Sequence, residues 1–296
     1  MTSKQGIALP FVSVIIPHYQ DLVGLKLCLA SLDAQTYPRD RFEVVLADNN
    51  SPIGSAAVEH VVAGRARLVV VIEKGAGPAR NGAVAMSQGE VLAFIDSDCV
   101  AEPAWLTEGV AALNRFDLVG GLVGVLVSDP IDMTAVEAFE RVFAFDFKTY
   151  IEKKGFTGAG NMFCRRELFD RVGPFGVALS EDVDWSRRAV TSGARLGYAP
   201  DAVVGHPARL TWEQLTSKWR RLNLETYGLM AGRRFRRTWW LARNALMPLS
   251  AIAHTPKVLT SAKLSTSRQR LLAISVLFRL RFWRLWDAVS IIANGR

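Results

Sequence analysis

The sequence predicts an α/β fold: a mostly parallel sheet with helices on both faces, joined to a basic helical region at the C-terminus. Short β-branched runs alternate with helical patterns up to about residue 100, and the balance of charge changes sign in the last third of the chain. Strands that alternate with helices favour a parallel sheet covered on both sides. At 296 residues, the chain is long enough for one large domain with an appendage.

Four apolar runs predict the first strands of the sheet, at residues 11–16, 42–47, 68–72 and 91–95. A Leu-rich helical pattern separates the first two runs. The other elements expected, in chain order, are a helix over about 77–88, a strand near 120–127, an amphipathic helix over 134–150, a glycine-rich loop over 155–161 and a helix over 181–192. Ligands of such sheets gather at the carboxyl ends of the strands, so residues that follow the runs are the first candidates for a site.

The charge changes along the chain. Residues 1–204 have a net charge of −6, whereas residues 205–296 carry 17 Lys and Arg against three Asp and Glu, net +14. We therefore predict a catalytic domain at 1–210 and a helical, membrane-associating region at 211–296. The cysteines are three in number and far apart, without a Cys-x-x-Cys pair, which fits a reducing compartment better than a disulfide scaffold or a zinc site. The N-terminus lacks the apolar core of a signal peptide.

The stretch 271–292 is long enough to cross a bilayer, but three arginines and Asp287 within it disfavour a simple span. In a helix, residues at three- and four-residue steps would form one stripe flanked by Arg and Trp: Leu271, Ser275, Phe278, Phe282, Leu285 and Val289. This pattern predicts a helix lying in the plane of an anionic membrane surface. A helical cap on the catalytic domain, with or without a dimer interface, is the alternative.

Two carboxylates, Asp96 and Asp98, leave the end of the fourth apolar run. On an extended chain, alternation places both on the same side. Neighbouring carboxylates repel each other unless a cation lies near them, and oxygen ligands suit Mg²⁺ or Mn²⁺ that also binds phosphate. An ordinary acidic turn is the alternative reading.

Two further acidic groups are candidates. Asp48 closes the second run and should lie at the same edge of the sheet as Asp96, although Asp, Asn and Ser are also common in turns. Glu181, Asp182 and Asp184 start a helical pattern that continues into two arginines. Helix capping and spaced ion pairs would explain that cluster equally well.

Six segments follow one another in a recognisable order: residues 12–19 (Val-Ser-Val-Ile-Ile-Pro-His-Tyr), 48–51 (Asp-Asn-Asn-Ser), 78–81 (Pro-Ala-Arg-Asn), 96–98 (Asp-Ser-Asp), 157–161 (Thr-Gly-Ala-Gly-Asn) and 181–184 (Glu-Asp-Val-Asp). Together they closely resemble glycosyltransferase family 2, whose members have the GT-A fold, a Rossmann-like sheet. The resemblance covers about residues 10–210. Six ordered pieces are far more specific than any one of them.

The resemblance implies a donor site for a nucleoside diphosphate sugar. Pro17 and Tyr19 would line the pocket of the base, Asp48 would accept a hydrogen bond from the base, and Arg80 would lie nearby. Asp96 would hold the ribose or the diphosphate side. UDP is the carrier that the resemblance favours.

The resemblance also implies the catalytic groups. Asp98 would bind Mn²⁺ or Mg²⁺, with His206 as a further metal or diphosphate contact, for which a structural histidine is the alternative. Asp182 would be the general base, and the reaction would invert the anomeric carbon. Glu181 and the loop residues would approach the donor sugar or the acceptor, with a plain tight turn as the alternative: Gly158, Ala159, Gly160 and Asn161.

The expected protein is a metal-dependent glycosyltransferase on the cytoplasmic face of the cell membrane, acting on a saccharide or lipid-linked saccharide in polysaccharide or glycan synthesis. Gln20 stands where family members commonly have Asn, and a Gln-x-x-Arg-Trp element is missing, so single additions are expected rather than polymer extrusion. The rival is a nucleotide-sugar-binding scaffold without turnover. The first strand lacks the Gly-x-Gly-x-x-Gly turn of a dinucleotide oxidoreductase, no nucleic-acid-reading module accompanies the charge, and an oligomer is left open.

Overall fold

The computed structural model describes residues 9–177, 180–228 and 230–294, and it contains an eight-stranded sheet. The N-terminal half alternates strand and helix as predicted, because each apolar run is too short for a helix and ends at turn residues. Its elements are β1 (Val12–His18), α1 (Leu22–Asp33), a 3₁₀ turn (Arg39–Arg41), β2 (Phe42–Asp48), α2 (Ser55–Val62), β3 (Arg67–Val70), α3 (Ala76–Ala85) and β4 (Val91–Ile95).

The later strands extend the sheet beyond β4. The strand order is β3-β2-β1-β4-β7-β6-β8-β5, in which β3, β2, β1 and β4 are parallel and β7 is antiparallel to both β4 and β6. The predicted α/β fold class is therefore confirmed. The other elements are β5 (Val100–Ala101), α4 (Trp105–Ala112), β6 (Leu118–Leu126), α5 (Ala135–Phe143), α6 (Phe147–Lys154), β7 (Asn161–Arg165), α7 (Arg166–Val172), α8 (Glu181–Thr191), β8 (Leu196–Pro207), α9 (Trp212–Gly228), α10 (Arg236–Ala245), α11 (Met247–Leu259) and α12 (Ser267–Ala293).

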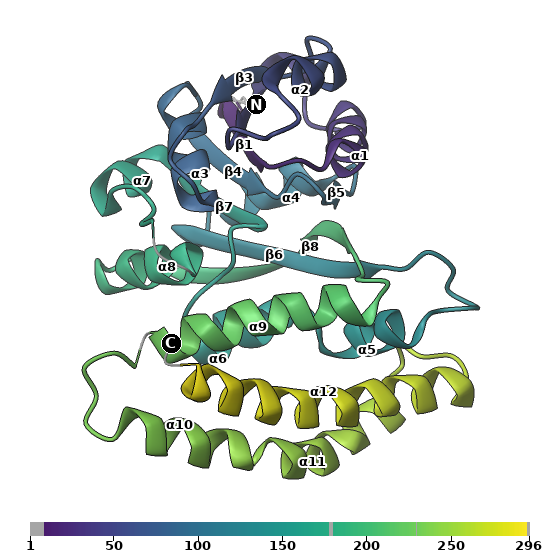
Figure 1. Ribbon diagram of the computed structural model, residues 1–296. Coiled ribbons are helices and arrows are strands. Elements are labelled where there is room, and N and C mark those ends of the chain that lie inside the picture. The colour runs from purple at the N-terminus through teal and green to yellow at the C-terminus, as the bar shows by residue number, and fades with distance from the viewer. Residues whose placement is uncertain (1–8, 178–179, 229, 295–296) are drawn as a thin grey trace. The chain divides into compact units, whose positions relative to one another are not determined.

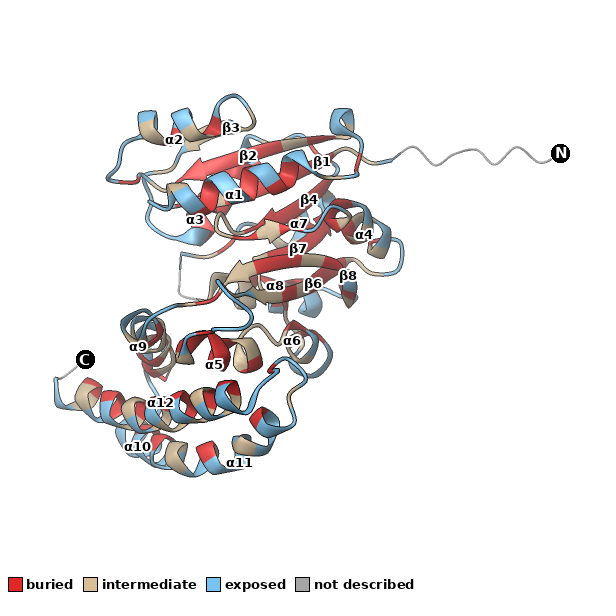
Figure 2. Ribbon diagram, turned by 90° about the vertical axis from the view of Figure 1, so that its right-hand side faces the viewer, coloured by how far each residue is buried: buried red, intermediate tan, exposed pale blue. Residues whose placement is uncertain are grey.

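Helices cover both faces of the sheet. Figure 1 shows α1 and α2 on one side of the parallel strands and α3 and α7 on the other, and β1, β2 and β4 are almost entirely buried (Figure 2), whereas the edge strand β3 is partly exposed. On the α3 side, Phe94 of β4 packs edge-on against Phe175 at 5.5 Å between ring centroids, and Phe169 stacks on Trp185 at 5.6 Å. Such aromatic pairs add to the burial of their large apolar surfaces, and they fix α7 and α8 against the sheet.

The chain divides into two compact units. Unit 1 comprises residues up to Gly124 together with Asp146–His206, and unit 2 comprises Val125–Phe145 together with Pro207–Arg296. By sequence, unit 1 has 18 basic and 21 acidic residues, whereas unit 2 has 18 basic and seven acidic residues. Segment 125–145 thus joins the basic C-terminal helices, which the charge pattern alone does not reveal. The assignment of 1–210 to catalysis and 211–296 to membrane association stays a prediction.

The amphipathic pattern over 134–150 forms two helices rather than the one predicted. Thr134 and Glu137 form a capping box at the start of α5, and Phe145, with φ of 56°, turns the chain out of the helix two residues after α5 ends. The side chain of Asp146 then accepts a hydrogen bond from the backbone N–H of Thr149 and caps α6. A new N-cap inside the pattern therefore divides it.

In unit 2, α12 packs on its neighbours through a stripe that includes Ala273, Val276, Leu277 and Leu280. The stripe expected to face a membrane lies on another side of the helix: Leu271 is 67% exposed, Phe282 57% and Val289 47%. Among the described helices, none combines the length and the low charge needed to cross a bilayer.

Candidate active site

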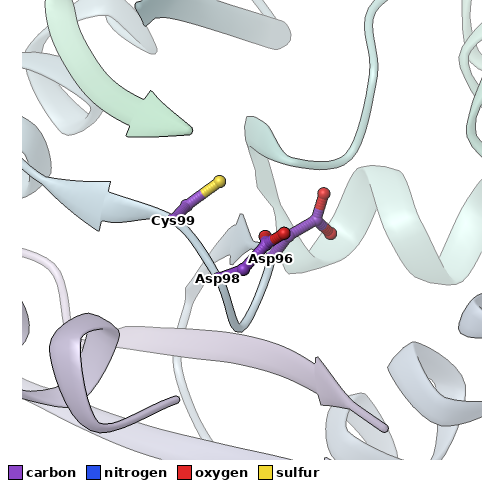
Figure 3. A group of neighbouring side chains, drawn as sticks. All are labelled: Asp96, Asp98 and Cys99. Carbon is purple, nitrogen blue, oxygen red and sulfur yellow. The ribbon is translucent and has the colours of Figure 1, made fainter. Parts of the chain in front are cut away.

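The centre of the site is the turn that follows β4. Ligand atoms of Asp96, Asp98 and Cys99 all lie within 4.8 Å of one another (Figure 3). The expected extended alternation is wrong in detail, because the backbone N–H of Cys99 donates to the carbonyl of Asp96 and closes a turn. The turn itself brings the two carboxylates together.

These residues fit a divalent metal. Burial raises the pKa of Asp98, the carboxylates of Asp96 and Asp21 raise it further, and His206, with Nε2 3.3 Å from Oδ2 of Asp98, opposes the shift. Arg80 pairs with Asp96, but the pKa of Asp98 stays raised despite His206, so the negative charge of Asp98 is only partly offset within the protein, and a cation would offset the remainder. Oxygen donors suit Mg²⁺ or Mn²⁺. Burial and the two carboxylates raise the pKa of the Cys99 thiol well above its usual value, so it stays protonated and is a poor ligand.

Arg80 of α3 connects the turn to α8. Its guanidinium donates to Oδ1 of Asp96 at 2.7 Å and to Oε1 of Glu181 at 2.6 Å. Burial lowers the pKa of Arg80, but the carboxylates of Asp96, Glu181 and Asp182 outweigh this and raise it. The arginine is only 4% exposed. It therefore acts as an internal counter-ion for carboxylates of two separate elements.

Asp182 lies in this group and is not turned out into solvent. Its Oδ2 accepts from the backbone N–H of Ala159 at 3.3 Å and its Oδ1 from the N–H of Val183 at 2.8 Å. Burial raises the pKa of Asp182, Glu181 adds to the rise, and Arg80 and the two backbone N–H groups oppose it. A carboxylate with a raised pKa accepts a proton more readily near neutral pH, as a general base must.

The glycine-rich loop connects the two acidic positions. A Cβ added to Gly158 would lie 3.3 Å from Oδ2 of Asp182, and one added to Gly160 would lie 2.7 Å from Oδ2 of Asp96. A side chain at Gly160 would have to displace the Asp96 carboxylate, and one at Gly158 would press on that of Asp182, so the two glycines let the backbone pass close to both. The loop thus lies against both the Asp96–Cys99 turn and the start of α8.

The sequence profile described as "Glycosyl transferase family 2" matches residues 13–173. The chain belongs to glycosyltransferase family 2. As a member of it, the protein is a glycosyltransferase that uses a nucleotide-sugar donor.

Family 2 relatives match most of the chain. Glycosyltransferase AglE of Haloferax volcanii is 34% identical over 253 residues, which cover 83% of this chain and 79% of that protein. Probable glycosyltransferase YdaM of Bacillus subtilis is 23% identical over 72% of this chain and 52% of its own length.

Two solved structures show the same fold. Mannosyltransferase PcManGT from Pyrobaculum calidifontis, in complex with GDP-Man and Mn²⁺, has a TM-score of 0.50 at 22% identity and covers 97% of this chain and 75% of that one. S. aureus TarS 1-349, in complex with UDP-GlcNAc, has a TM-score of 0.53 at 17% identity and covers 97% and 92%. At these identities, the likeness establishes the GT-A fold.

Most of the residues predicted for the family 2 site are brought together. The described contacts join eight of them into one continuous group: Arg80, Asp96, Asp98, Gly158, Ala159, Glu181, Asp182 and His206. Gly160 lies against Asp96 in the same group. Pro17 lies near the end of β1, and Tyr19, just beyond it, is 54% exposed.

Asn161 lies inside the sheet. It is fully buried, its amide donates to the carbonyls of Leu122 and Ala202, and its Oδ1 accepts from the indole N–H of Trp105. With both ends of the amide used, the side chain ties β6, β8 and α4 to β7. Asn161 directly follows Gly160, so these hydrogen bonds fix the end of the glycine loop in the sheet.

Asp48 forms a second buried cluster with residues that the sequence reasoning missed. Its Oδ1 pairs with Nδ1 of His18 at 2.9 Å, and both its oxygens accept from Ser51. The two hydrogen bonds from Ser51 and the one from His18 outweigh burial, so the pKa of Asp48 is lowered. The register of β1 and β2 places His18 directly beside Asp48, so adjacent parallel strand ends were the signal that could have found this pair. If Asp48 also bound a nucleotide base, that contact would be made in addition to its hydrogen bonds with His18 and Ser51.

Proposed function

We propose that the protein transfers a sugar from a UDP-sugar to an acceptor hydroxyl with inversion at the anomeric carbon. The observation that carries this proposal is the convergence of Asp182 with Asp96 and Asp98, with Arg80 lying between the two ends of the group. A donor-binding site and a base are both needed for direct displacement, and these carboxylates supply the two.

In this mechanism Asp182 takes the proton of the acceptor hydroxyl as its oxygen attacks the anomeric carbon from the face opposite the diphosphate. The new carbon–oxygen bond forms while the bond to the diphosphate breaks, and the electron pair leaves with the diphosphate. Arg80 opposes the rise in the pKa of Asp182 that burial causes, and it thereby favours the ionised form that must accept the proton. Glu181 and the glycine loop would lie beside the transferred sugar.

Asp96, Asp98 and His206 would hold Mn²⁺ or Mg²⁺, which would offset the negative charge that develops on the diphosphate. The solved structures of PcManGT and of GalNAc-T7 contain Mn²⁺, which supports a metal at a site of this type. Pro17 and Tyr19 would hold the base, and Asp48, held by His18 and Ser51, would stand at its edge.

We further propose that the acceptor is a lipid-linked saccharide of cell-surface polysaccharide or glycan synthesis. The protein would work as a peripheral protein on the cytoplasmic face of the cell membrane. The basic charge of unit 2 and its exposed apolar helix faces support this location. They would place the enzyme beside a substrate that does not leave the bilayer.

A screen of nucleotide sugars by thermal shift, with Mn²⁺, Mg²⁺ or chelator, tests the donor site. We expect a UDP-sugar to raise Tm only when metal is present, because the ligand stabilises the folded state in proportion to its binding. A GDP-sugar that does so instead would correct the base. No shift with any donor would contradict the proposal.

The rival function, a nucleotide-sugar-binding scaffold without turnover, is separated by the reaction itself. Transfer or slow donor hydrolysis should be lost in Asp182→Asn, while the metal-dependent thermal shift remains. Wild-type protein that binds donor but neither transfers nor hydrolyses it with saccharide and lipid-linked acceptors would favour the scaffold.

A further inference from the structure

Helices α10 and α11 expose an unusual amount of apolar surface. Of the 24 large hydrophobic side chains that are exposed in the described part of the chain, seven lie between Phe235 and Leu259, in less than a tenth of the sequence. On α11 and the turn before it, Leu246 is 61% exposed, and Leu249 and Ile252 are each 62% exposed. Apolar surface concentrated in this way marks an interaction site rather than an ordinary surface.

These residues form one outward-facing row. Leu246, Leu249 and Ile252 follow one another at three-residue steps, the spacing that keeps side chains on one face of a helix. The buried residues of the same two helices, Trp240 and Ala251, lie on the opposite side and pack within unit 2. The outward faces of α10 and α11 remain exposed in Figure 2. The row therefore stays exposed to solvent, although both helices are packed against the rest of unit 2.

Positive charge borders this row. No Asp or Glu occurs between Glu225 and Asp287, whereas that interval contains 12 Lys and Arg. Five arginines lie just before or on α10: Arg233, Arg234, Arg236, Arg237 and Arg243. Within the described residues, none of the five forms an ion pair with a carboxylate. Four of them lie over aromatic rings instead.

We propose that the apolar row of α10 and α11 docks on an anionic lipid bilayer, with both helices lying in the plane of the headgroups. Leu246, Leu249 and Ile252 would enter the boundary with the acyl chains, and the arginines would reach the phosphates beside them. Trp239, 56% exposed, would lie at the headgroup level that this residue type favours. The 61 residues between Glu225 and Asp287 contain no acidic side chain, so their charge complements anionic lipid. A second copy of the chain docked on the same row would bring two positively charged surfaces together.

This inference gives the proposed membrane attachment a surface and a lipid chemistry, and it rests on that location rather than on the transfer reaction. It differs from the sequence-based expectation, which placed the membrane contact on α12.

Flotation of the full chain with vesicles tests it. The intact protein should float with phosphatidylcholine vesicles that contain phosphatidylglycerol, but not with phosphatidylcholine alone, and salt should weaken the binding. Leu249→Glu should lower the partition coefficient about tenfold, because it removes an inserted side chain and adds a negative charge. The matched control is Ile131→Glu, the same change at a loop residue of unit 2 that is 82% exposed, and it should bind as the wild type does.

A second pair of variants tests the charge. Arg233→Gln with Arg237→Gln should weaken flotation, whereas Arg115→Gln with Arg171→Gln, which removes the same charge from exposed positions of unit 1, should not. The proposal is overturned if the intact protein ignores anionic vesicles, or if each variant binds like its control. It is also overturned if light scattering shows a dimer that Leu249→Glu dissociates without changing flotation, since the row would then join two copies.

The same preparations should be screened for a metal-dependent thermal shift with nucleotide sugars. A donor shift without flotation refutes the membrane surface alone. Flotation without a donor shift refutes the proposed function alone.

Discussion

The two units handle charge in opposite ways. In unit 1, carboxylates from separate elements converge on Arg80, which is 4% exposed and linked to two of them. In unit 2, five arginines lie just before or on α10, four of them exposed, and none forms an ion pair with a carboxylate among the described residues. Buried charges must be paired because desolvation is costly, whereas exposed ones can remain available to a partner. The degree of burial therefore separates Arg80, which positions carboxylates within the protein, from the arginines near α10, which can bind a partner.

The largest effect on activity is expected for Asp182 of unit 1. Asp182→Asn should lower kcat about 10³-fold or more, within the range for loss of general-base catalysis, and leave donor affinity intact. The same change should raise Tm, because a carboxylate whose pKa is raised by burial destabilises the folded state above that pKa. Steady-state kinetics and calorimetry check the two expectations. A variant that keeps its kcat would refute the role of the residue.

The next largest effect, on stability, is expected when Arg80, the counter-ion of Asp96 and Glu181, is replaced. Arg80→Met should destabilise the protein by about 3 kcal/mol, the lower end for a buried pair, because the carboxylates of Asp96 and Glu181 that lose their partner are partly exposed. The control is Arg195→Met, which breaks an exposed pair with Asp117 and should change stability little. Urea unfolding of both variants measures the difference. Equal losses would mean that burial does not separate the two pairs.

The pH dependence of transfer is a smaller effect. Asp182 must be ionised to act, so kcat/KM should fall about tenfold per pH unit once pH drops below its pKa. Because burial raises that pKa, the fall should begin at a higher pH than for an ordinary Asp. Arg80→Lys keeps the charge but loses the fork geometry, and should move the onset. A profile with no acid limb would argue against a carboxylate base.

The smallest effects are expected in unit 2. Glu140 is 1% exposed and accepts from Arg209 at 2.8 Å and from Lys218 at 3.3 Å, so Glu140→Gln should cost about 1.5–3 kcal/mol. These cations lower its pKa against burial, so this stabilisation is present at neutral pH and is lost as pH falls through the lowered pKa. Arg268→Gln, which breaks an exposed pair with Asp132, should cost about 0.5 kcal/mol or less. Chemical denaturation at neutral and acidic pH compares the two.

The sequence was most informative where local pattern and fold agree. Val91–Ile95 is a continuous apolar run with Asp96 at its end, so both the buried strand and the carboxylates at the sheet edge could be predicted. Arg80 could be named from the resemblance, but its place between Asp96 and Glu181 could not, because those partners lie 16 and 101 positions away. Long-range pairings of this kind leave no periodic signal.

Helix α12 is a second case in which the sequence pattern does not reveal tertiary contacts. Its sequence contains two apolar stripes, one through Leu271 and Phe282 and one through Ala273 and Leu280. Periodicity predicts the helix but does not say which stripe packs inside the protein. The structure buries the second, because its small and medium side chains allow the neighbouring helices to approach closely.

The clearance at Gly160 has a consequence for how the enzyme can vary. Its backbone torsions are ordinary, so flexibility is not what demands glycine; the demand comes from Asp96, whose Oδ2 would be 2.7 Å from any Cβ. Even one methyl group there would have to displace a carboxylate that a buried guanidinium already holds in place. A larger residue at position 160 is therefore expected to change the position of the Asp96 carboxylate, and with it the geometry of the Asp96–Asp98 turn, even if the loop backbone stays where it is.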